Sequence, residues 1–231
     1  MDRLLEAFAQ TFRGQVYKHR LPYTGDSIAL HLFEDLYHLG HSATLIKRIV
    51  ALEVAVNTGN QIKGKKGRRG DGTLGRVVPG LIPERAQGFA VPRGLVANLE
   101  IGSEVKIGAT KLLAQVDRVV NDLTKQARVF RELNAGAIRV AFVGVNFADS
   151  YLGHEGQRTF QAKSPPSREA AEFARRIERH VAPEYDELLI LRFKATNADP
   201  FPFEWLDEEQ LRQHYRSILV RISAEYNRRF T

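Results

Sequence analysis

The sequence predicts an α/β protein in which helices flank a central mixed sheet. Residues 95–107 alternate apolar and polar side chains, which is typical of a half-buried strand. A long amphipathic segment follows, and residues 137–145 then form an almost wholly apolar run, as expected of a strand buried on both faces. Strand, helix and buried strand in this order favour a right-handed crossover to a parallel neighbour.

The length and composition predict a single domain over residues 1–231. A chain of 231 residues suits one large α/β domain, and it shows no internal repeat or interdomain linker. No apolar run approaches the ~18–20 residues that span a bilayer, and the N-terminus has no signal-type apolar core, so we expect a cytoplasmic protein without a membrane partner. The absence of cysteine excludes disulfides, thiolate metal sites and a cysteine nucleophile.

Before the central strand, the pattern alternates between helices and short extended segments. Residues 21–26 read as a loop. Ser42 is a good N-cap for a helix that we expect to reach Asn57, since apolar residues recur there every three or four positions. The segments expected here are a short helix near 4–12, helices at 28–39 and 42–57, and strands at 73–78 and 87–91.

After the central strand, the amphipathic segment 110–133 predicts the clearest helix of the chain. A long polar connection at 146–166 follows the buried strand and reads as either a binding loop or a plain connection. The remaining expected segments are a helix at 167–181, a strand at 187–195, an irregular stretch at 197–205 and a final helix capped by Asp207.

The positive charge is concentrated just before the central strand. The chain carries a net charge of +7, and the glycine-rich window from Lys63 to Arg93 holds eight basic residues against Asp71 and Glu84. Such a window is either a solvated basic loop or a surface that binds phosphate groups, as in nucleic acid. It lacks the Gly-Lys-Ser/Thr of a phosphate loop, and Asp71-Gly72 by itself indicates only a turn. The candidate nucleic-acid contacts are Lys63, Lys65, Lys66, Arg68, Arg69, Arg76 and Arg93.

The central strand carries the candidate chemistry. Glu104 and Lys106 are two residues apart and share one face of a strand, and Glu100 joins them if the strand runs unbroken through Gly102. A carboxylate is a hard ligand suited to Mg²⁺, and a nearby ammonium stabilises a developing anion or polarises a water. Glu53 lies at the margin of an apolar helix stripe, where it either reaches water or serves a site.

The order of helix, strands, Glu104-Val105-Lys106, long helix and buried strand resembles the PD-(D/E)xK nuclease superfamily, which includes many restriction endonucleases. The resemblance covers about residues 42–145, and 146–231 would be a C-terminal elaboration. It implies that Glu104 binds Mg²⁺, that Lys106 is the catalytic lysine, that Asp71 is the upstream metal-binding acid and that Glu53 is the helix glutamate. Glu100 could replace one of the acids if the strand bulges at residues 102–103.

The resemblance therefore implies a Mg²⁺-dependent endonuclease of the type II restriction type that acts on double-stranded DNA, with a homodimer as one option. Asp71 departs from the family pattern, because it follows Gly70 rather than proline and precedes Glu104 by 33 residues. Three other functions remain open from the residues. They are a non-catalytic nucleic-acid-binding protein, an α/β enzyme for a small anionic ligand, and a partner-binding protein that uses the aromatic-rich segment 201–226.

Overall fold

The structure is a computed structural model, and it describes residues 2–18, 21, 23–65, 69–153, 158–161 and 166–230. The described residues form an α/β protein with a seven-stranded sheet and a separate two-stranded hairpin. The elements in chain order are α1 (Arg3–Gln10), α2 (Thr24–Leu39), α3 (Ala43–Val50), β1 (Val54–Asn57), β2 (Gly72–Val77), β3 (Arg93–Gly94), β4 (Val96–Gly108), α4 (Leu112–Leu133), β5 (Ile138–Asn146), β6 (Ser150–Gly153), β7 (Arg158–Gln161), α5 (Pro166–Val181), η1 (Ala182–Glu184), β8 (Glu187–Ala195), β9 (Phe203–Trp205) and α6 (Glu208–Arg229).

The large sheet has the strand order β3-β1-β2-β4-β5-β8-β9 and mixes both strand directions. β2 is antiparallel to β1 and β4, whereas β4, β5 and β8 run parallel to one another. The predicted order of β4, α4 and a parallel β5 is therefore confirmed, as is the predicted α/β class with a mixed sheet flanked by helices. The smaller sheet, β6 and β7, lies within the connection that follows β5.

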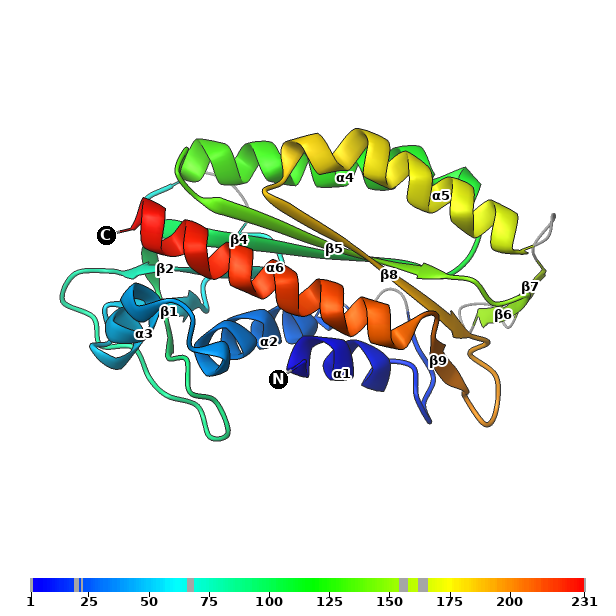
Figure 1. Cartoon of the computed structure of the whole chain (residues 1–231), viewed down its shortest axis with the longest axis horizontal. Helices are drawn as coiled ribbons and strands as arrows, with labels where there is room; N and C mark the ends of the chain where they lie inside the picture. The colour runs from blue at the N-terminus through cyan, green and yellow to red at the C-terminus, as the bar shows by residue number, and fades with distance from the viewer. Residues whose placement is uncertain are drawn as a thin grey trace.

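Helices cover both faces of the large sheet. Figure 1 shows α4 and α5 along one face and α1, α2, α3 and α6 along the other. Each face has its own cluster of buried apolar side chains, with Phe130 and Phe173 beneath α4 and α5, and Phe33, Phe142 and Tyr215 on the opposite side. β4 lies between the two clusters, so each of its faces is covered along most of its length.

The helix predicted over residues 42–57 is shorter than expected. Ser42 caps α3 as predicted, since its Oγ accepts a hydrogen bond from the Leu45 backbone N–H at 3.1 Å. The helix ends at Val50, and Leu52 then adopts a left-handed φ of 59° that turns the chain into β1. All four residues of β1 are buried, so their apolar side chains belong to a strand covered on both faces rather than to a helix stripe.

Several other boundaries differ because they depend on pairing with distant segments. Residues 87–91 form no strand, and the short β3 that follows pairs with β1 instead. The end of the stretch 197–205, expected to be irregular, contains β9, which pairs with β8. The expected loop 21–26 overlaps the first turn of α2, which begins at Thr24. The predicted strands β2, β4, β5 and β8 and helices α4, α5 and α6 are confirmed, with small shifts at their ends.

Candidate active site

The C-terminal half of β4 places Glu104 and Lys106 on one face of the sheet. Both residues lie on the side of α4, as does Gly102, where an added Cβ would lie 2.8 Å from the ring of Phe130. The Lys106 Nζ lies 2.6 Å from Glu104 Oε1, while the side chains are 31% and 7% exposed, respectively. The predicted pair is therefore a short ion pair with a buried carboxylate.

Asp71 joins this pair from the start of β2. In the antiparallel register Gly72 lies opposite Ser103, which brings Asp71 next to Glu104. The backbone N–H of Val105 donates a hydrogen bond to Asp71 Oδ2 at 2.8 Å. Three of the residues predicted for the site, Asp71, Glu104 and Lys106, are thus brought together by the β2–β4 pairing.

The electrostatics of the cluster are dominated by burial and by two neighbouring carboxylates. Burial, together with the charge of Asp71, raises the pKa of Glu104 to about 7 from its usual 4.5, although Lys106 opposes the shift. Burial also raises the pKa of Asp71, against the opposing effects of Lys106 and of the Val105 backbone N–H. Burial disfavours the charged form of Lys106, but Glu104 and Asp71 outweigh it and raise the pKa of this ammonium.

One oxygen of the cluster has no partner. Glu104 Oε2 is buried and makes no hydrogen bond, although its twin Oε1 contacts Lys106. With one ammonium for two carboxylates, the ionised cluster carries excess negative charge in a poorly solvated position. A divalent cation would supply both the missing charge and a ligand for the free oxygen. Mg²⁺ is commonly bound by one or two carboxylates plus substrate phosphates, so Asp71 and Glu104 fit such an ion. Among the described residues, however, no group of three or more His, Cys, Asp and Glu side chains could hold a metal ion.

Glu100 does not join the cluster. The register of β2 and β4 shifts opposite Glu100, between the pairs Leu74–Ile101 and Gly75–Leu99. This irregularity turns Glu100 toward α3 and α6, where Arg48 donates to both of its carboxylate oxygens at 2.7 and 2.9 Å. The Tyr226 hydroxyl also donates to Glu100 at 2.6 Å. Glu100 is therefore the acceptor of a buried structural network.

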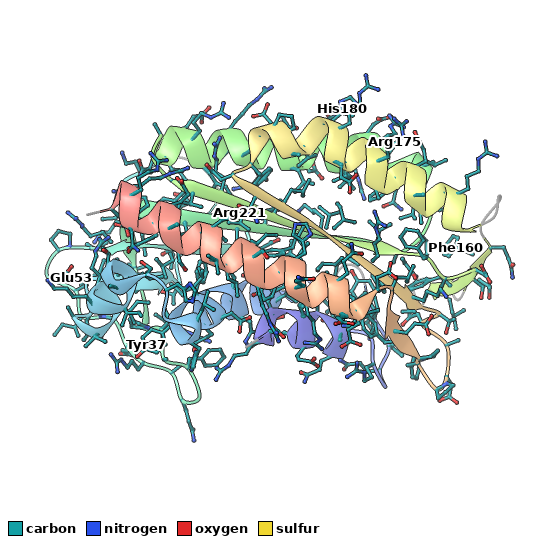
Figure 2. The ribbon with its side chains drawn as sticks, viewed as in Figure 1. Tyr37, Glu53, Phe160, Arg175, His180 and Arg221 are labelled. Carbon is teal, nitrogen blue, oxygen red and sulfur yellow. The ribbon has the colours of Figure 1, made fainter. Side chains whose placement is uncertain are left out.

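Glu53 also lies apart from the cluster. Because α3 ends early, Glu53 falls in the turn before β1, with a side chain that is 58% exposed and 3.5 Å from Arg48 Nε. Figure 2 labels Glu53 at the outer end of the molecule, beside α3. The structure thus favours the interpretation of Glu53 as a boundary residue that reaches water.

The residues predicted to contact nucleic acid differ in their exposure and in whether they already form interactions within the protein. Lys63, Lys65 and Arg76 are exposed and have no ion pair within the described part of the chain. Arg93 stacks on Phe89 at 4.2 Å from the ring centre. Lys66 and Arg68 lie outside the described residues.

Within the described residues, Arg69 is already paired, in contrast to Lys63, Lys65 and Arg76. Its guanidinium forms an ion pair with Asp26 and also donates to the backbone carbonyl of Asp71 at 3.1 Å. Asp26 and its neighbour Gly25 belong to the first turn of α2, although the sequence predicted a loop at these two positions. An acidic residue such as Asp26 is typical of the first turn of a helix, so the sequence could have indicated that α2 begins here. No local pattern, however, links Asp26 to Arg69, which lies more than forty positions away.

No protein-family model, curated protein or solved structure matches the chain. No helix in the described part of the chain combines the length and apolarity that a membrane span requires. Any proposal of function therefore rests on the geometry of the Asp71–Glu104–Lys106 cluster and on the basic residues that precede it in the sequence.

Proposed function

We propose that this protein is a Mg²⁺-dependent endonuclease that hydrolyses phosphodiester bonds in double-stranded DNA, as type II restriction enzymes do. One observation carries the proposal: two carboxylates and one ammonium converge, and a buried carboxylate oxygen is left without a partner. Hydrolysis of a phosphodiester needs an activated water and neutralisation of the charge that develops on the phosphate. This combination of groups suits both needs.

The residues have distinct roles in this proposal. Asp71 and Glu104 would hold the cation through their carboxylate oxygens, and a bound Mg²⁺ would polarise the attacking water and neutralise phosphate charge. Lys106 stays protonated beside the two carboxylates, so its ammonium stabilises negative charge on the reacting phosphate. The exposed Lys63 and Lys65 lie shortly before Asp71 in the chain and would attract the DNA backbone.

A cleavage assay on supercoiled plasmid tests the proposal. We expect nicking and linearisation with Mg²⁺ and none with EDTA. Lys106→Ala should lower the rate by roughly 10²–10³-fold, the range for loss of one group that stabilises transition-state charge, and Glu104→Gln, which removes a proposed metal ligand, should lower it at least as much. The matched controls are Glu178→Gln, at an exposed position on α5, and Lys194→Ala, which removes an exposed lysine paired with Glu204 at 3.0 Å.

Each outcome of this assay separates two functions. Cutting that persists in EDTA, or that survives Glu104→Gln at the wild-type rate, contradicts the proposal. DNA binding without cutting in any divalent metal would instead support a non-catalytic nucleic-acid-binding protein. Absence of binding to nucleic acid would favour an enzyme for a small anionic ligand.

We also infer that the protein acts on DNA as a homodimer, because cutting both strands in a single binding event needs two such clusters. One cluster per chain serves one strand at a time, and a two-fold symmetric pair would match the symmetry of a duplex. Sedimentation of the Glu104→Gln variant with a short duplex tests this inference. Two chains per duplex are expected, and one chain per duplex would contradict it.

A further inference from the structure

We propose that the first turn of α2 is the positioning element of the metal site, with Gly25 as its central residue. The inference rests on the proposed function, because it assigns to Gly25 the task of keeping the Asp71 carboxylate where a divalent cation would need it. Gly25 itself touches no reacting atom and acts only through Asp71.

The contact between α2 and Asp71 leaves no room for a side chain. An added Cβ at Gly25 would lie 2.6 Å from both Cγ and Oδ2 of Asp71 and 2.9 Å from Oδ1. The three nearest atoms all belong to the Asp71 carboxylate, so this carboxylate packs directly against the backbone of α2 at Gly25. No left-handed φ is involved at this position, so alanine would suit the helix itself.

Two further contacts fix the same residue from other directions. The Val105 N–H holds Asp71 Oδ2 at 2.8 Å, and Arg69 Nη1 holds the Asp71 backbone carbonyl at 3.1 Å. Arg69 is in turn held by Asp26, which follows Gly25 in the same helical turn. One turn of α2 thus sets both the side chain and the main chain of a proposed metal ligand.

A double-mutant cycle tests the steric part of this proposal. Gly25→Ala should lower the melting temperature of the otherwise wild-type protein, because the new methyl group displaces the carboxylate. In an Asp71→Ala background the same change should raise the melting temperature, since the obstacle is gone and alanine favours helix. Gly136→Ala is the matched control, because the nearest atom to its added Cβ is 3.5 Å away.

Metal binding tests the functional part. Mn²⁺ binding, followed by electron paramagnetic resonance without DNA, should weaken by roughly 10–100-fold in Gly25→Ala, the range for loss of a residue that orients a metal ligand. Arg69→Met should also weaken it. Removing a nearby positive charge would by itself strengthen cation binding, so the direction of the change separates positioning from charge.

The outcomes distinguish this proposal from the proposed function. If Gly25→Ala does not fold but Gly25→Ala/Asp71→Ala does, the steric contact is supported and Arg69→Met alone reports on metal binding. If both Gly25 variants fail to fold, or if Gly25→Ala and Arg69→Met bind Mn²⁺ as tightly as the wild type, the positioning role is overturned. A wild type that binds Mn²⁺ but cuts no DNA overturns the nuclease alone, and one that binds no Mn²⁺ overturns both.

Discussion

Replacing Glu104 with glutamine should stabilise the metal-free protein at alkaline pH. The Glu104 side chain is only 7% exposed, and its pKa rises from 4.5 to about 7 on folding because burial and Asp71 disfavour the charged form. Between these two pH values the folded protein retains a proton that the unfolded chain has lost. The free energy of unfolding therefore falls as pH rises through this range.

The size of this effect follows from the same shift. One pKa unit corresponds to about 1.4 kcal/mol, so ionising Glu104 in the folded state costs about 3 kcal/mol of stability above neutral pH. Glutamine keeps the size of the side chain and can still accept a hydrogen bond from Lys106, but it cannot ionise. On going from acidic to alkaline pH, the free energy of unfolding of Glu104→Gln should thus rise by about 3 kcal/mol relative to that of the wild type.

Urea unfolding in EDTA, at several values from about pH 5 to about pH 8, measures this difference. Contributions of the histidines are common to both proteins and cancel when the two curves are subtracted. Glu178→Gln, which makes the same chemical change at an exposed position, should run parallel to the wild type. If the difference in unfolding free energy between the wild type and Glu104→Gln stays constant across this pH range, the reasoning is refuted. Added Mn²⁺ should restore the stability of the wild type at alkaline pH but not that of the variant.

Three other predictions concern binding and the scaffold. Replacing Lys63 and Lys65 with alanine should weaken DNA binding, measured by fluorescence anisotropy. The slope of log binding constant against log salt concentration should fall in magnitude by up to about 0.9 per lost phosphate contact, and an unchanged slope would mean that the DNA binds elsewhere. Glu100→Ala should cost about 3–5 kcal/mol in urea unfolding because the buried Arg48 loses its bidentate partner and keeps only the Tyr226 hydroxyl and the exposed Glu53. Mn²⁺ affinity should stay near the wild-type value, and a large loss of affinity would place Glu100 in the metal site. Ser42→Ala should cost about 1 kcal/mol of unfolding free energy because α3 loses its cap, and a neutral result would contradict that assignment.

Local patterns predicted the parts of the fold and the site that depend on neighbours in sequence. The alternation along β4 placed Glu104 and Lys106 on one face, and the structure confirms their contact. Asp71 was predicted only through a family resemblance. Its approach to Glu104 comes from antiparallel pairing across 33 residues, and no local pattern records this pairing.

The remaining differences arise where distant segments decide the geometry. Glu100 was placed with Glu104 by the same alternation, but a register shift against β2 sends it to the opposite side, and a bulge leaves no trace in a period-two pattern. Glu53 was placed on a helix because the apolar residues of β1 continue the helical spacing by chance. Gly25 was predicted only as part of a loop, since its importance depends on the Asp71 carboxylate, which comes from the residue before β2.

Because β2 begins only at Gly72, Asp71 has a second structural role. Beyond Ser103, β4 continues to Gly108 beside β5, but β2 no longer accompanies it on the other side. Here the Asp71 carboxylate accepts the hydrogen bond from the Val105 backbone N–H that a neighbouring strand would otherwise accept. Removing that side chain would leave the Val105 N–H without its acceptor on a stretch of strand edge that β2 does not cover, where another polypeptide strand could pair, so asparagine, which keeps an acceptor oxygen, is the safer substitution at this position.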